Sequence, residues 1–182
     1  GANVPFAVRA RVCLLRDLGS ALAPDNAFAI IQGLETVALR MRQHCANAEY
    51  VVDFLKKHKE VTKVIYSTEH DKPIADRAKK YLKGGNGPMI GIELKGGIEA
   101  GKKFIESLKM FYHVANIGDA RSLAIHPAST THSQLNEKEL AASGVTQSYV
   151  RLCIGIEHID DIIEDLDQAL NKSSKGNLKA VS

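Results

Sequence analysis

The chain has 182 residues, of which 45% are hydrophobic, so its length and composition fit one globular domain with enough chain to bury a core. Its 24 basic and 21 acidic residues are interspersed and leave a formal net charge of +3, which argues against a nucleic-acid or membrane-binding surface. Cys13, Cys45 and Cys153 are odd in number, far apart and set in apolar runs. This pattern, with no signal-peptide or membrane-spanning run, predicts a soluble cytoplasmic protein with reduced thiols.

The first predicted elements are helical. A short helix is expected from Phe6 to Leu18, ended by Gly19. Pro24 then opens a stretch to about position 58 in which apolar residues recur at helical spacing, which predicts one long helix. One face of so long a helix stays uncovered in so small a domain, so we expect it to pack against a further domain. Its interior His44 is interpreted as a partly buried or surface residue without a catalytic role.

Beyond this helix the pattern alternates between strands and helices. Strands are predicted at VTKVIYS, PMIGIEL, FYHVANI, SLAIH and YVRLCIGIE, and helices near residues 74–82, 98–108, 136–142 and 159–171. The polar tail, residues 172–182, is expected to fray. The sequence therefore predicts an α/β domain, in which helices cover a sheet.

The last predicted strand, YVRLCIGIE, carries the strongest candidate for a binding residue. Its branched aliphatic residues alternate with Arg151, Cys153, Gly155 and Glu157, so one face suits a helix layer and the other is open enough for approach by another surface. A guanidinium on a rigid strand suits a carboxylate or phosphate. On the pattern alone, an ordinary ion pair between Arg151 and a neighbouring acid is the preferred interpretation, and the chemistry of Arg151 stays open.

Three other segments are interpreted as structural. In HPASTTH, Pro127 prevents the two histidines from sharing a helical face as zinc ligands, and no third group orients Ser129 and His132 as a catalytic pair. KGGNGP lacks the flanking elements of a phosphate-binding loop and is predicted to be a turn. The acidic run between positions 157 and 165 opens a helix, where the helix dipole favours negative charge, and is predicted to be a solvated face.

Three long blocks, LGSALAPDNAFAIIQGLETVALRMRQHCANA, NIGDARSLAIHPASTTHSQL and VRLCIGIEHIDDIIEDLDQAL, resemble the C-terminal part of the Cys/Met-metabolism pyridoxal-phosphate enzymes, and most of all their sulfhydrylase branch. The resemblance implies the small C-terminal α/β domain of an aspartate-aminotransferase-like, fold type I enzyme, with a mainly antiparallel sheet covered by helices and preceded by a long connecting helix. It assigns residues 1–58 to the end of the cofactor domain and the connecting helix, residues 59–171 to the C-terminal domain, and the rest to a flexible tail.

The resemblance also implies functional residues. Arg151 matches the arginine that holds the α-carboxylate of the amino-acid substrate, and Asn116 matches a residue of the same pocket; taken alone, Asn116 is interpreted as an amide that caps a loop. The Schiff-base lysine and the other residues that bind pyridoxal 5'-phosphate belong to a segment that this sequence does not match, and they are expected upstream of Gly1. The segment alone is therefore expected to be inactive, to contain no catalytic residue, and to bind no metal.

The activity implied is γ-replacement, in which O-acetyl-L-homoserine and a sulfide or thiol give L-homocysteine or methionine, in a cytoplasmic homotetramer. Two alternatives stay open. The complete enzyme could be a cystathionine γ-synthase or a methionine γ-lyase of the same family, or the chain could be a non-catalytic association domain.

Overall fold

The computed structural model describes residues 4–174, except for the side chains of Glu137 and Ala141, and the contacts within the chain divide it after Ala38 into two compact units. The first unit holds helix α1 (Pro5–Arg9), a π-helical stretch η1 (Ala10–Leu15), helix α2 (Arg16–Leu18) and helix α3 (Pro24–Glu35). The first three are continuous and end at Gly19, whose φ of 68° is a left-handed conformation that glycine adopts without steric cost. The predicted short helix is thus confirmed.

The predicted long helix is interrupted once. Helix α3 ends at Glu35, and helix α4 spans Val37–Leu55. Between them Thr36 adopts φ −107° and ψ 3°, outside the helical region. A β-branched residue three positions after Gly33 makes this the point where helix propensity is weakest, which accounts for the break.

The second unit is built on a four-stranded sheet made of β1 (Val61–Ile65), β2 (Met89–Leu94), β3 (Leu123–Ile125) and β4 (Tyr149–Cys153). The strands lie in the order β1-β2-β4-β3, and all neighbours are antiparallel. The register places Gly91 of β2 and Ile125 of β3 on either side of Arg151 in the central strand β4. The antiparallel sheet of the predicted fold class is therefore present.

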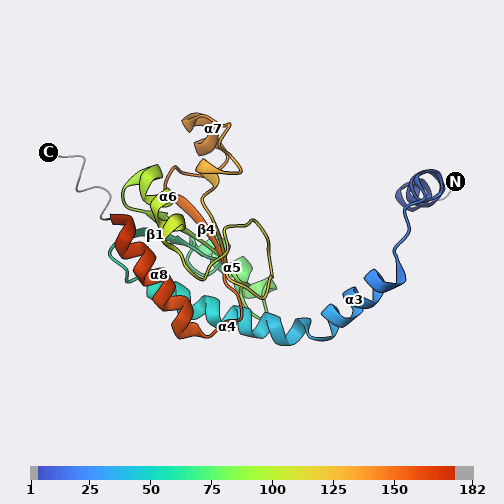
Figure 1. Ribbon diagram of the computed structural model, residues 1–182, viewed down its shortest axis with the longest axis horizontal. Helices are drawn as coiled ribbons and strands as arrows, with labels where there is room; N and C mark the ends of the chain where they lie inside the picture. The colour runs from blue at the N-terminus through green and yellow to red at the C-terminus, as the bar shows by residue number, and fades with distance from the viewer. Residues whose placement is uncertain (1–3, 175–182) are drawn as a thin grey trace. The chain divides into compact units, whose positions relative to one another are not determined.

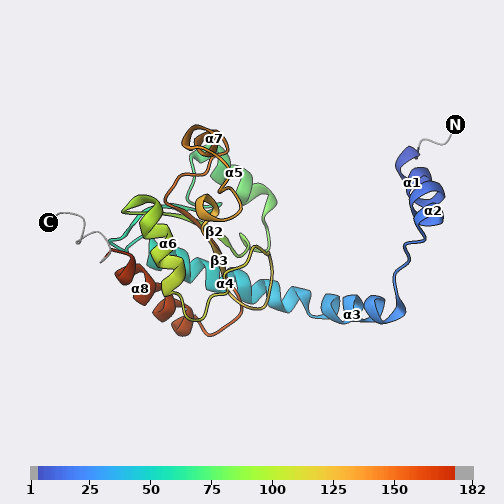
Figure 2. The same cartoon turned by 45° about the horizontal axis from the view of Figure 1, so that its top comes forward.

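Helices close one face of this sheet. The helices of this unit are the larger part of α4, α5 (Lys72–Tyr81), α6 (Gly97–Ser107), α7 (Glu137–Ala142), α8 (Ile159–Ser174) and the short 3-10 helix η2 (Pro127–Ser129). Figure 1 shows α4 and α8 along one side of the sheet, and Figure 2 shows α6 beside α8. The core between these helices and the sheet includes Leu55, Phe104, Leu152 and Leu166, each fully buried. Burying a side chain of this size stabilises the fold by about 1.5–3 kcal/mol.

The predicted strand FYHVANI is wrong. Within it Tyr112 alone pairs with the sheet, through an isolated parallel bridge to Leu123, and the chain then turns, with the Val114 amide donating to the Tyr112 carbonyl. The side chains of Tyr112, Val114 and Ile117 are exposed, so burial does not hold these residues in the extended form that their β propensity favours. Residues after Tyr112 therefore form an irregular segment that leads to Asn116.

Three of the residues assigned to the tail, 172–174, belong to α8, and the remainder lies outside the described residues. None of the helices in residues 4–174 combines the length and the apolar character needed to cross a bilayer. Cys13, Cys45 and Cys153 are all free thiols, as expected from their spacing.

Candidate functional site

Arg151 lies in the middle of the central strand β4, on the face away from the helical core. Its strand neighbours Val150 and Leu152 are fully buried in that core, whereas Arg151 is half-buried. This is the alternation expected of a strand with one face packed on helices. In residues 4–174 no carboxylate forms an ion pair with Arg151, so the simple surface ion pair that the sequence left open is absent there.

The structure brings the two predicted site residues together. The guanidinium Nη2 of Arg151 donates a hydrogen bond of 3.3 Å to the backbone carbonyl of Asn116, although 35 positions separate the two residues. The side chain of Asn116 meanwhile accepts a hydrogen bond of 2.9 Å from the amide of Ile117, so it does cap its loop. Arg151 uses one donor on the loop, which leaves others of its planar fork for a ligand.

A hollow of about 390 Å³ opens beside Arg151 on the same face of the sheet. Gly91 lies opposite Arg151 in the register, and the ring of Tyr149 occupies the space that a β-carbon at Gly91 would need, at 2.6 Å from the ideal position of that atom. Any side chain at position 91 would therefore displace Tyr149. His70 also lines this hollow.

The charge state of this region is set by burial. Burial raises the pKa of Tyr149 above its ordinary value of 10.0, with a smaller opposing effect from Arg151. It also raises the pKa of the Cys153 thiol, which the Gly118 amide and Arg151 lower in part. Both groups are therefore neutral near pH 7, and Arg151 carries the positive charge beside them. The arrangement suits an anionic ligand with an apolar portion.

The HPASTTH segment is an ordered connection, as interpreted from the sequence. His126 is buried, and its Nε2 and Nδ1 atoms lie 2.8 Å from the Gln147 carbonyl and 2.8 Å from the Ser129 hydroxyl. A neutral ring with the proton on Nε2 satisfies both contacts. Burial lowers the pKa of His126. His132 instead contacts the Thr131 hydroxyl, so Ser129 and His132 do not pair.

KGGNGP forms a turn before β2, as predicted. Gly85 and Gly87 have φ angles of 129° and 81°, and a β-carbon at Gly85 would lie 2.6 Å from the sulfur of Cys45. The side chain of Asn86 accepts a hydrogen bond from Ser67. Glycine is thus required here for backbone conformation and for packing.

The expectation of a solvated acidic face is wrong for two residues. Asp165 is buried and accepts hydrogen bonds from the backbone amides of residues 109–111, at 2.8 to 3.3 Å, and from the amide of Gln168. Glu157 accepts hydrogen bonds from the amide and the hydroxyl of Ser122, at 2.6 and 2.9 Å. The acidic pattern gives no signal of these partners, because all of them except Gln168 lie 35 or more positions away.

His44 is also buried, not at the surface. Its Nδ1 donates to the carbonyl of Ile154 at 2.7 Å, which ties α4 to the chain just after β4. Its other ring nitrogen has no hydrogen-bond partner within residues 4–174.

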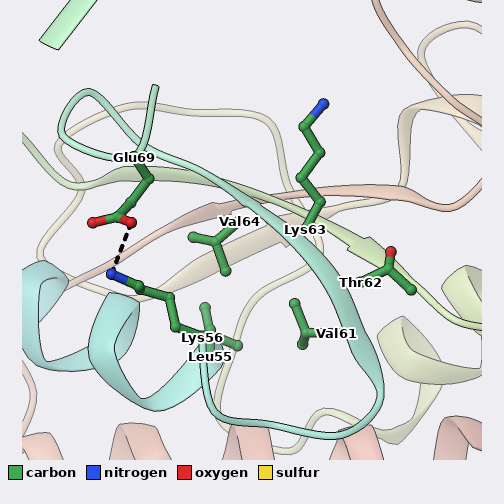
Figure 3. A pocket seen from close by; sticks show the side chains of 7 residues that line it. All are labelled: Leu55, Lys56, Val61, Thr62, Lys63, Val64 and Glu69. Atoms are coloured by element: carbon green, nitrogen blue, oxygen red, sulfur yellow. Dashed lines mark ion pairs between the residues drawn. The ribbon is translucent and has the colours of Figure 1, made fainter. Parts of the chain in front are cut away.

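A second hollow, of about 220 Å³, lies against the edge strand β1, and its side chains do not form a reactive group (Figure 3). Lys56 pairs with Glu69 at 2.8 Å, and this partner raises the pKa of Lys56. Lys63 extends away from that pair. Its own contact is with Glu93, at 3.7 Å. Because each lysine here has a carboxylate partner, the region around Arg151 is the better candidate for ligand binding.

The described residues do not by themselves fit a pyridoxal phosphate site. No lysine in residues 4–174 is buried, and none lines the hollow beside Arg151, so none of them is placed there to bind the cofactor covalently. The expectation that the cofactor-binding residues lie upstream of Gly1 falls outside the described residues and stays a prediction. The described part of the chain also has no group of three side chains placed to hold a metal ion.

The comparisons with known proteins all point to one enzyme family. Residues 4–171 match the family model described as Cys/Met metabolism PLP-dependent enzyme. The chain is 51% identical over 171 residues to the O-acetyl-L-homoserine sulfhydrylase of Leptospira meyeri, covering 93% of this chain and 39% of that protein. It is 43% identical over 171 residues to the L-methionine gamma-lyase of Fusobacterium nucleatum subsp. polymorphum, covering 93% and 43%.

Solved structures agree. A putative O-acetylhomoserine (thiol)-lyase from Campylobacter jejuni, which carries a pyridoxyl-lysine phosphate, superposes with a TM-score of 0.83 at 42% identity, covering 93% of this chain and 41% of that one. The cystathionine gamma synthase of Xanthomonas oryzae gives a TM-score of 0.76 at 31% identity, covering 87% and 41%. The predicted fold class is confirmed. The chain spans about two fifths of the length of these relatives.

Proposed function

Because this chain belongs to the Cys/Met metabolism PLP-dependent enzymes, we propose that the complete enzyme makes L-homocysteine from O-acetyl-L-homoserine and sulfide, with acetate as the leaving group. The identity of 51% to a sulfhydrylase supports this reaction over others in the family. A thiol in place of sulfide would give methionine or another thioether by the same replacement at Cγ.

The observation that carries the proposal is Arg151. Its guanidinium lies on a rigid central strand, has no carboxylate partner within residues 4–174, and is flanked by neutral Tyr149 and by the loop that bears Asn116. In our proposal Arg151 binds the α-carboxylate of the substrate through its planar fork, and Asn116 lines the same pocket. Arg151 therefore orients the substrate and transfers no proton.

The cofactor is held elsewhere in this proposal. Since no described lysine lines the hollow beside Arg151, the groups that bind pyridoxal phosphate in this proposal come from the part of the relatives' length that this chain does not span, upstream of Gly1. We expect the 182-residue chain alone to be inactive. When the chain is mixed with pyridoxal phosphate and reduced with borohydride, the label should not concentrate on one specific lysine.

Within the same family, the reaction could instead be γ-elimination or cystathionine formation. The identity of 43% to a methionine gamma-lyase supports the first candidate, and the likeness to a cystathionine gamma synthase supports the second. Product analysis with sulfide, with cysteine and without any thiol separates the three. We further propose a cytoplasmic homotetramer; the three free thiols support the cytoplasm.

The test of the proposed function is Arg151→Met in the full-length holoenzyme. A charge-assisted bond to a carboxylate contributes about 1.5–3 kcal/mol, so kcat/KM for O-acetylhomoserine should fall at least about tenfold. Arg151→Lys should restore only part of this loss, because an ammonium supplies charge without the planar fork.

The matched control is Arg77→Met, which removes an exposed arginine of α5. It should leave kcat/KM within about twofold of the starting value, as exposed substitutions usually do. The absorption of the bound cofactor should stay unchanged in all three variants. An Arg151→Met enzyme with full cofactor occupancy and normal kcat/KM would show that Arg151 is not the carboxylate anchor.

A further inference from the structure

Residues 116–122, here called the Asn116 segment, run alongside residues 151–157 without forming a strand. Arg151 donates to the Asn116 carbonyl, the Gly118 amide lies 3.5 Å from the sulfur of Cys153, and the Ile156 amide donates to the Ala120 carbonyl at 2.9 Å. Each of these contacts joins residues 35 or 36 positions apart, so the two stretches run parallel to each other with a nearly constant offset. Most of the segment is exposed, so hydrogen bonds hold it in place more than burial does.

The far end of the segment is held by a clamp made of Ser122, Gly155 and Glu157. The carboxylate of Glu157 accepts hydrogen bonds from both the amide and the hydroxyl of Ser122, and that hydroxyl in turn accepts one of 2.9 Å from the Gly155 amide. Ser122 is fully buried, which strengthens these bonds by excluding water. A β-carbon at Gly155 would meet Glu157, Ser122 and Ala120 together, so the clamp closes only around glycine.

Helix α4 anchors the clamp to the core. Asn47, which is buried, donates through its side-chain amide to the carbonyls of Gly155 and Glu157 at 3.0 and 2.9 Å. His44 holds the carbonyl of Ile154 one residue earlier. The clamp is therefore hydrogen-bonded to buried residues of the second unit.

We infer that Ser122 and Glu157 are positioning residues, which fix the Asn116 segment against β4 so that Asn116 and Arg151 present one preformed site to the substrate carboxylate. This inference rests on the function proposed above for Arg151. An irregular segment keeps many conformations unless side chains remove them, and a site is effective only when its groups are held within about 0.5 Å. Ser122 lies six positions after Asn116, and Gly155 and Glu157 lie four and six positions after Arg151. The clamp therefore joins the two stretches a short distance beyond the site and limits how far Asn116 can move from Arg151.

The test is a double-mutant cycle on the full-length holoenzyme with Ser122→Ala and Arg151→Met. Ser122→Ala removes the hydroxyl that joins Glu157 to Gly155 and keeps the amide bond to Glu157. We expect KM for O-acetylhomoserine to rise about five- to tenfold, with kcat changed less than about twofold and the cofactor absorption unchanged. In the Arg151→Met background the same substitution should change KM less than about twofold, because the contact it positions is already gone.

Two further variants separate positioning from stability. Ser173→Ala removes another buried serine hydroxyl, which donates to the Leu170 carbonyl at 2.7 Å in α8, and should leave KM unchanged. Glu157→Gln keeps an oxygen for the Ser122 amide, so it should raise KM less than Glu157→Ala does. If Ser122→Ala yields no folded holoenzyme, Glu157→Gln takes its place in the cycle.

The outcomes are distinguishable. The positioning role is overturned if KM is normal in the Ser122→Ala enzyme, or if KM rises by the same factor with and without Arg151. Neither result contradicts the proposal that Arg151 binds the substrate carboxylate. A normal kcat/KM in the Arg151→Met enzyme overturns the proposed function and the positioning role with it. An increase in KM that depends on Arg151 supports both.

Discussion

Replacing Asp165 by asparagine tests what holds residues 109–111, which precede the irregular segment that leads to Asn116. The carboxylate of Asp165 is buried, and its two oxygens receive the amides of Lys109, Met110 and Phe111 as well as the side chain of Gln168. Four donors converge on one acceptor group, at the point where α6 has ended and the chain turns toward β3. Asparagine has almost the same shape but carries no charge and only one acceptor oxygen.

The magnitude follows from these contacts. Hydrogen bonds to a charged group contribute about 1.5–3 kcal/mol and those between neutral groups about 0.5–1.5 kcal/mol, so three amides lose about 1 kcal/mol each. The new side-chain amide also faces donors. Gln168 can relieve part of this by turning its amide, since its oxygen has no partner within residues 4–174, but it then gives up its 2.6 Å bond to the Ser107 carbonyl. We expect Asp165→Asn to cost about 2–3 kcal/mol.

Urea unfolding of the 182-residue chain, followed by circular dichroism, measures this cost. With a dependence of about 2 kcal/mol per molar urea, the midpoint should fall by about 1–1.5 M. Glu164→Gln, an exposed change one residue earlier in α8, should move it by less than about 0.3 M. Equal midpoints for the two variants would refute the reasoning that Asp165 anchors residues 109–111.

Two further predictions concern His126. Burial lowers the pKa of His126 below its ordinary value of 6.5, so below that pH the unfolded chain binds more protons than the folded one. The stability that depends on neutral His126 is therefore complete above about pH 6.5 and is lost as the pH falls below it. In the His126→Gln variant, the urea midpoint of unfolding should change less between pH 7 and pH 5 than in the unmodified chain. Gly101→Ala should cost about 1–3 kcal/mol in urea unfolding, because a β-carbon there meets the His126 ring, whereas Gly84→Ala, with no atom within 4 Å, should be nearly neutral; similar values for both would contradict the contact.

The elements with regular patterns were predictable from the sequence. Alternation in YVRLC places Val150 and Leu152 in the core and Arg151 on the other face, and the structure confirms this because one face of β4 is covered by helices. Likewise Pro127 and the glycines of KGGNGP mark turns, since their backbone preferences are local. Local patterns thus predicted the strand that carries Arg151.

The support of the site was not predictable, because it depends on partners distant in sequence. FYHVANI has strand propensity, yet Tyr112 makes a single isolated bridge to the sheet. From Asn116 to Ser122 the chain is instead held largely by the side chains of Arg151, Cys153 and Glu157. Asp165 looks like any acid near the start of a helix until the amides it binds are known. A buried carboxylate with main-chain partners leaves no periodic signal, so only the fold reveals it.

The attachment of the Asn116 segment has a consequence for how specificity can diverge in such enzymes. A β-ladder fixes a backbone whatever side chains it carries, because its bonds come from the main chain. Residues 116–122 have few main-chain bonds of this kind, and they depend in addition on a serine, a glutamate and a glycine at single positions. In the function proposed above, one substitution at the clamp would shift the loop that bears Asn116 relative to Arg151, while β4 keeps its main-chain pairing with β2 and β3.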